Sequence, residues 1–154
     1  MIIIAVLTGC AGFLLAVLWM DLIFDSQVLA HRDSPEQLPE PVLASIAAYY
    51  QRATTSSRPM SVLVALVMFI LLAALVFRFI VGDDAGWVIG VSIVLAAIPI
   101  GLALTRTVPN AKRLGARTDS VVEQTRLARA IFTDHVLCLV FMLGFLGLWL
   151  NKAA

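Results

Sequence analysis

Residues 60–81 read MSVLVALVMFILLAALVFRFIV, and this stretch decides the class of the fold. Arg78 is the only charged residue in it. A helix needs about 20 mostly apolar residues to cross the hydrocarbon core of a bilayer, so a stretch of this length and composition spans a membrane. Three further apolar stretches lie before and after it. The sequence predicts four spanning helices, near residues 2–24, 59–82, 85–107 and 120–151.

The composition of the whole chain agrees with a lipid environment. Of its 154 residues, 61% are hydrophobic and 14% charged, whereas soluble domains are about half apolar and a quarter charged. So small a soluble fold has too little interior to bury this much apolar surface. We therefore predict an all-α, integral membrane, antiparallel four-helix bundle, formed by residues 1–154 as one domain. The net charge of +1 gives no attraction to nucleic acid.

The connections between the predicted helices differ in kind. Gly82, Asp83 and Asp84 make a link so short that the second and third helices form a hairpin, in which Arg78 can pair with either aspartate. The first connection is long and begins with prolines at positions 35, 39 and 41. Residues 41–54 then predict a short helix at the membrane interface, where tyrosines are common.

Two further signals concern the second half of the chain. Pro109, Asn110 and Gly115 lie in the predicted third loop. Ser120 and Glu123 then have the spacing of a capping box, which predicts that the last helix begins well before the membrane. Pro99 is predicted to kink the third helix.

Basic residues indicate the orientation. Loops 1 and 3 and their borders carry nine of the 11 Lys and Arg residues, and only Arg78 and Lys152 lie on the other side. The positive-inside rule then places loops 1 and 3 in the cytoplasm and both termini outside. We interpret the chain as a protein of a bacterial inner (plasma) membrane.

Ionisable side chains gather at one end of the predicted bundle. Asp21 and Asp25 are four residues apart and share one helix face. Asp134 and His135 lie in the last helix, although neighbouring residues on a helix point about 100° apart. Arg106 ends the third helix. Such residues are costly within a membrane and often mark a site.

Three readings of this polar layer stay open. In the first, Asp21 and Asp25 pair with Arg106 or with loop arginines and hold the bundle together. In the second, the layer surrounds a pocket in which a carboxylate or imidazole moves protons on a bound molecule. In the third, His135 and His31, or the carboxylates, bind a metal or haem, although no HxxxH, HxxE or ExxH spacing occurs. No metal ligand is assigned, and the cofactor is unknown.

Several short motifs resemble one family of small membrane proteins. They are LWMDLIF at 18–24, YYQR at 49–52, RPM at 58–60, TRTVPNAKRL at 105–114 and LARAIFTDH at 127–135. In this order they are similar to the four-helix membrane proteins that include fungal anthrone oxygenases and many uncharacterised bacterial members. The resemblance implies, for some members, an oxygenase with no cofactor or a poorly defined one, acting on polycyclic phenols.

Two functions of different classes follow. The first is an oxidase or oxygenase of a small hydrophobic molecule, with His135 and Asp21 as catalytic residues. The groups expected to bind its substrate are Asn110, Arg106, Asp25, Asp134 and Tyr49. The alternative is a non-enzymatic accessory or structural subunit of a larger membrane complex, whose basic third loop docks a partner or anionic lipid. A transporter built as a homo-oligomer is a third possibility.

Overall fold

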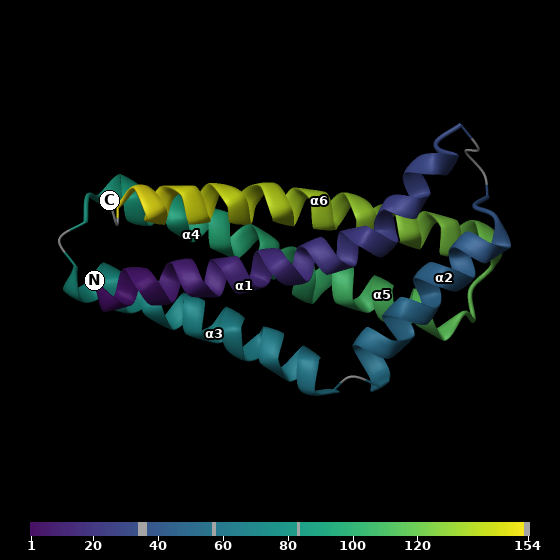
Figure 1. Ribbon diagram of the computed structural model, residues 1–154, viewed down its shortest axis with the longest axis horizontal. Helices are drawn as coiled ribbons and strands as arrows, with labels where there is room; N and C mark the ends of the chain where they lie inside the picture. Colours follow the sequence, from purple (N-terminus) through teal and green to yellow (C-terminus); the bar gives the residue numbers. More distant parts are fainter. Residues whose placement is uncertain (34–36, 57, 83, 153–154) are drawn as a thin grey trace.

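A computed structural model describes residues 1–33, 37–56, 58–82 and 84–152. These residues form helices and connections and no strand. In chain order the elements are α1 (Ile2–Asp25), the 3-10 turn η1 (Ser26–His31), α2 (Glu40–Gln51), the π-helical turn η2 (Arg52–Ser56), α3 (Arg58–Val81), α4 (Gly86–Leu102), the π-helical turn η3 (Ala103–Thr107), α5 (Val108–Ala116) and α6 (Val121–Asn151). Figure 1 shows α1, α3, α4 and α6 side by side, with both termini at one end.

Four helical segments of the described chain are long and apolar enough to cross a membrane. They are Ile2–His31, Pro59–Val81, Gly86–Ala116 and Val121–Asn151. Their outer surfaces are apolar, as Phe69 and Ile80 of α3 show with exposures of 68% and 72%. A continuous surface of such side chains marks contact with lipid or with another apolar surface. The prediction of an all-α integral membrane bundle is confirmed.

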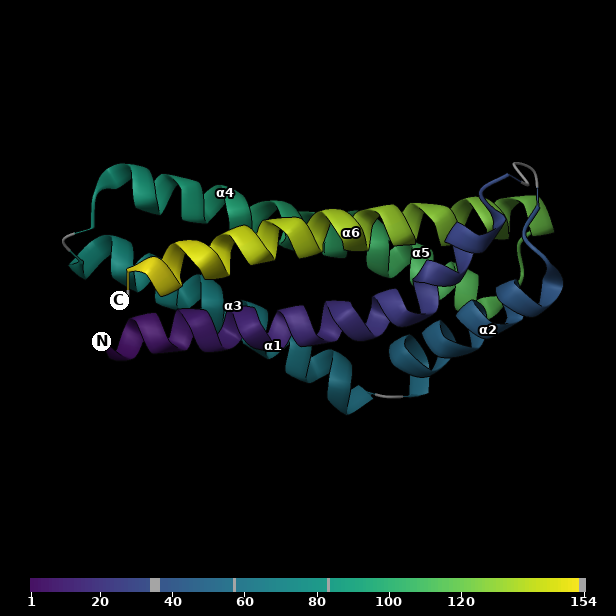
Figure 2. The same cartoon turned by 45° about the horizontal axis from the view of Figure 1, so that its top comes forward.

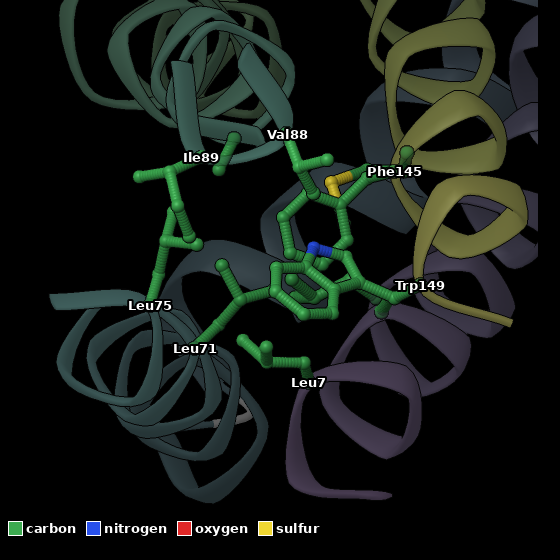
Figure 3. Packing of buried hydrophobic residues seen from close by; sticks show 11 residues of the cluster. Leu7, Leu71, Leu75, Val88, Ile89, Phe145 and Trp149 are labelled. Carbon is green, nitrogen blue, oxygen red and sulfur yellow. The ribbon is translucent and has the colours of Figure 1, made fainter. Parts of the chain in front are cut away.

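A membrane core lies between these four helices near the end that carries the termini. Leu7, Leu71, Val88 and Phe145 pack around the indole of Trp149, which is completely buried (Figure 3). The other two tryptophans lie near opposite ends of the spans. Trp19, close to the end of α1, is 63% exposed, and Trp87, at the start of α4, is 65% exposed.

A second core lies at the opposite end of the molecule. It joins α2, α5, η1 and the first turns of α6 through Val28, Leu43, Ile46, Leu114 and Leu127. The sequence predicted α2 as an interfacial helix, and in the structure it lies against α1 and α5 at this end (Figure 2). We call η1, α2, α5 and the first turns of α6 the cap.

One glycine permits the contact between α2 and α5. A Cβ atom at Gly115 would lie 2.8 Å from the backbone nitrogen of Gln51 and 3.1 Å from its Cα. These are backbone atoms, so they have no side-chain rotation with which to give way. Any larger residue at this position therefore pushes the end of α2 away from α5.

The third loop is more helical than predicted. Residues 108–116, which include Pro109 and Asn110 of the predicted loop, form α5. Pro109 lies at the start of α5, directly after the π-helical turn η3, and proline is tolerated at the beginning of a helix. The helix ends at Arg117, whose φ of 56° is left-handed. The true loop is therefore only the few residues between Ala116 and Val121.

The predicted start of α6 has the expected cap. Ser120 precedes the helix, and its hydroxyl accepts the backbone N–H of Glu123 at 3.3 Å. The carboxylate of Glu123 does not complete the box but binds Arg113 and Arg126. Pro39 precedes α2 and Pro41 lies in its first turn, whereas Pro35 falls outside the described residues.

The ends of α3, α4 and α6 meet at an ion pair. Arg78 donates to Asp84 at 2.5 Å, and Lys152 lies 3.4 Å from the same carboxylate. Hydrogen bonding from Arg78 lowers the pKa of Asp84 below its usual value. The alternative partner predicted for Arg78, Asp83, lies outside the described residues.

Candidate functional site

The two acidic residues of α1 meet the two tyrosines of α2. Tyr49 donates its hydroxyl proton to Asp21 Oδ1 at 2.6 Å, and Tyr50 donates to Asp25 Oδ1 at 2.6 Å. The ring of Phe24 stacks on Tyr49 with 4.1 Å between centroids. Asp25 is completely buried. The four-residue spacing on α1 thus presents both carboxyl groups to α2.

His135 of α6 completes this cluster. Its Nδ1 lies 2.6 Å from Asp25 Oδ2 and 3.4 Å from the Tyr50 hydroxyl. So short a distance to a carboxyl oxygen requires a proton between the two atoms, and we assign this proton to the imidazole Nδ1, with the carboxylate as the acceptor. The other ring nitrogen, Nε2, lies 3.8 Å from Asp21 Oδ2. The side chains of α1, α2 and α6 are thereby connected where the two cores meet, and we call this group the polar cluster.

Asp134 belongs to a separate pair on η3. Its Oδ2 lies 3.2 Å from Arg106 Nε and accepts the Thr107 hydroxyl at 3.3 Å. Asp134 and His135 are adjacent in sequence but point toward different neighbours, as the angle between consecutive helical residues requires. Together they attach α6 to α1 and α2 through His135, and to η3 through Asp134.

The structure brings together most of the residues that the sequence singled out. Asp21, Asp25, Tyr49 and His135 lie in the polar cluster, and Arg106 and Asp134 form the second pair. Asn110 is half-buried on α5, and no hydrogen bond among the described residues joins its side chain to either group.

One predicted pairing is wrong. Arg106 does not pair with Asp21 or Asp25, because it lies on η3 beside Asp134. Two residues that take part in these contacts, Tyr50 and Thr107, were not among the predicted site residues. Thr107 carried no signal of its own, whereas Tyr50 had one: it falls on the same apolar face of α2 as Ile46, which places it toward the bundle.

The environment of the two phenols keeps them protonated. Burial raises the pKa of both Tyr49 and Tyr50 well above the ordinary value, and the neighbouring carboxyl groups of Asp21 and Asp25 raise it further. Each tyrosine therefore acts as a neutral donor to an acidic side chain. This bonding secures α2 against α1.

A cavity of about 150 Å³ borders the polar cluster. Its walls are mostly apolar and come from α1, α3, α4, η3, α5 and α6, and Asp21, Thr107 and His135 lie at its polar end. Within the described ranges, no group of three or more His, Cys, Asp and Glu side chains is arranged to hold a metal ion. His31 lies apart, with Nδ1 3.4 Å from the Gln27 carbonyl oxygen.

Comparison with known families identifies a match over nearly the whole chain. The family model of the SHR3 chaperones, described as "ER membrane protein SH3", matches residues 1–152. No curated protein and no solved structure matches the chain. The match covers all four spanning segments and the cap.

This match corrects two predictions. The resemblance to the anthrone oxygenase family is wrong as a family assignment, because the family found over residues 1–152 is a different one. The oxygenase reading rested on that resemblance and loses its support. The placement in a bacterial inner membrane is also wrong, because the description of the family is that of an ER membrane protein. The integral membrane character stands, and the sidedness of the loops stays a prediction.

Proposed function

Since this chain belongs to the SHR3 chaperone family, whose description is ER membrane protein SH3, we propose that it is an accessory protein of the ER membrane that assists the folding or assembly of other membrane proteins. The observation that carries the proposal is the extent of the match, which runs over residues 1–152. Of the functions that the sequence left open, this one corresponds to the non-enzymatic subunit.

The polar cluster supports a structural role for its residues. Both oxygens of the buried Asp25 carboxyl group are hydrogen-bonded, one to Tyr50 and one to His135. Buried polar groups that satisfy one another hold helices in a defined register. We therefore assign these bonds first to the joining of the cap and the membrane core, which would make residues 1–154 one functional unit.

The outer surface supports contact with other membrane helices. Along α3 the large side chains Val62, Phe69, Phe79 and Ile80 are 65–72% exposed. In a bilayer this surface meets either lipid or the helix of another protein, and neither requires a polar partner. A membrane-embedded client is thus a partner that the surface is able to accept.

Depletion of the protein in its native cells tests the proposal. We expect a subset of multispanning membrane proteins to stay in the ER and to form large aggregates after mild detergent extraction. Re-expression of the wild-type chain should restore their normal size and location. If quantitative proteomics finds no membrane protein whose aggregation changes on depletion, the proposed function is wrong.

A further inference from the structure

The cavity beside the polar cluster has the size of one side chain. Its volume of about 150 Å³ resembles that of an engineered apolar cavity that holds one benzene molecule. Its apolar walls include Leu14 of α1, Val64 and Met68 of α3, Ile100 of α4 and Met142 of α6. The cavity therefore suits a single aromatic or aliphatic group, and it is too small for a polycyclic molecule.

The cavity has an open wall within the membrane-spanning part of the chain. Val64 and Met68 of α3 line one side, and Ala103 and Thr107 of η3 line another. α3 packs on α1 and α4 and has little or no contact with η3. Figure 1 shows the first half of α3 leaving the bundle. Val108, at the edge of the cavity, is 41% exposed. A group that enters here comes from the lipid side.

The polar end of the cavity offers hydrogen-bond acceptors. Asp21 Oδ2 and His135 Nε2 lie 3.8 Å apart, and no hydrogen bond of either atom occurs among the described residues. Because the Nδ1 proton of His135 is directed to Asp25, a neutral imidazole presents Nε2 as an acceptor. The side chain of His135 is only 9% exposed.

The charges around this end favour a donor or a cation. Three carboxyl groups lie here, those of Asp21, Asp25 and Asp134. They face only one guanidinium, that of Arg106, and the imidazole of His135. Thr107 does not change this balance, because its hydroxyl donates to Asp134. Acidic groups therefore outnumber basic groups at this end of the cavity.

We propose that the cavity receives one side chain with an N–H or O–H donor from a transmembrane helix of a client protein. The proposal rests on the chaperone function proposed above and gives that function a site. A polar side chain on a client helix is unfavourable in lipid until its own partners are in place. In the cavity its apolar stem would contact α3 and η3 while its donor binds Asp21 or His135.

Synthetic transmembrane peptides test the site directly. The full chain, labelled with a fluorophore and placed in lipid nanodiscs, would be titrated with labelled Leu/Ala peptides of about 24 residues. One peptide carries a lysine one turn inside its end, and the other carries leucine there. We expect the lysine peptide to bind about tenfold more tightly. Equal binding of the two peptides would overturn the proposal.

Two substitutions on one helix provide the matched comparison. Val64→Phe fills the cavity, whereas Val62→Phe adds the same bulk at a position that is 65% exposed and outside the cavity. We expect Val64→Phe to remove the preference for lysine and Val62→Phe to preserve it. Asp21→Asn is a further variant, which tests the acceptor without filling the space. A preference that survives Val64→Phe in a folded protein contradicts the site.

The same pair of variants separates failure of the site from failure of the function. In depleted cells, Val64→Phe should rescue the clients less well than Val62→Phe. If depletion affects clients and both variants rescue them fully, the site is wrong and the chaperone function stands. If depletion affects no client, the chaperone function itself is wrong.

Discussion

Asp25 shows how a single residue joins two parts of this molecule. It belongs to α1, yet its oxygens bind Tyr50 of α2 and His135 of α6. A carboxyl group that is completely buried is stable only while these bonds persist. The energetic consequence is asymmetric, because removing one partner leaves the other buried without compensation.

Replacing His135 by alanine should therefore destabilise the protein strongly. Breaking a buried charged pair by removing one partner costs about 3–5 kcal/mol, and we expect a loss of this order in the free energy of unfolding. Thermal unfolding of the detergent-solubilised protein measures it. Asn110→Ala is the control and should change stability by less than about 0.5 kcal/mol. If the His135→Ala protein unfolds at the same temperature as the wild type, this account of the polar cluster is wrong.

The chain has two tyrosines, so their titration reports on this cluster alone. Burial and the neighbouring carboxyl groups raise the pKa of Tyr49 and Tyr50. We expect no tyrosinate absorbance from the folded protein at pH values just above 10, the ordinary pKa. The same protein unfolded in denaturant should titrate near that value.

The sign of the effect on stability follows from the direction of the shift. Because the folded protein holds the protons more tightly, the stability from this source is complete below pH about 10. It is lost as the pH rises above that value toward the raised pKa of the folded state. Folded protein that forms tyrosinate near pH 10 would show that the two phenols are not buried as described.

At the scale of the element, Gly115 determines where α2 lies. A Cβ atom at this position would meet the backbone of Gln51 at 2.8 Å, directly after Tyr49 and Tyr50. Gly115→Ala should push α2 outward and cost about 1–3 kcal/mol, as overpacking does elsewhere. It should also lower the pKa of both tyrosines toward the ordinary value, which the same ultraviolet titration detects.

A second glycine provides the control. A Cβ atom at Gly90, inside α4, would have nothing within 4 Å. Gly90→Ala should leave the tyrosine titration unchanged and stabilise the protein by about 0.5–1 kcal/mol, since alanine is the better helix former. If the two variants behave alike, the close approach at Gly115 does not control α2.

The elements differ in how far the sequence could predict them. The four spanning helices follow from composition alone, because no other fold accommodates such long apolar runs. The convergence of Asp21 and Asp25 also follows from their spacing. α5 was missed because Pro109 and Asn110 are common in loops, while proline is equally suited to a first helical turn. The pairing of Tyr50 with Asp25 depends on the rotation of α2, which contacts with α5 determine.

For the whole molecule, the main feature is the stacking of two cores along one axis. α6 has 31 residues, so it is about 46 Å long at 1.5 Å per residue. The hydrocarbon core of a bilayer is about 30 Å thick. We therefore expect the first turns of α6, with the cap around them, to stand outside the hydrocarbon, and the polar cluster to lie near its boundary.

Weakening the polar cluster should loosen the cap more than the spans. In Asp25→Asn we expect faster hydrogen exchange at the backbone amides of α2 and α5, because the cap loses its attachment to α1 and α6. Amides in the middle of α3 should keep their protection, since lipid surrounds them. Mass spectrometry of peptides from the two regions measures this, with Asn110→Ala as the comparison. Equal acceleration in both regions would mean that the two cores unfold as one.

Because the three tryptophans differ in exposure, their fluorescence can report how deeply the protein lies in the bilayer. Trp149 is sealed in the membrane core, whereas Trp19 and Trp87 face outward near opposite ends of the spans. Lipids brominated at chosen positions along their acyl chains should quench the fluorescence of Trp19 and Trp87, each most strongly when the bromine lies at the depth of its indole. They should not quench Trp149. The quenching of tryptophan fluorescence should therefore report how the tilt and depth of the protein change when the bilayer becomes thicker or thinner. The unquenched fluorescence of Trp149 serves as the internal reference.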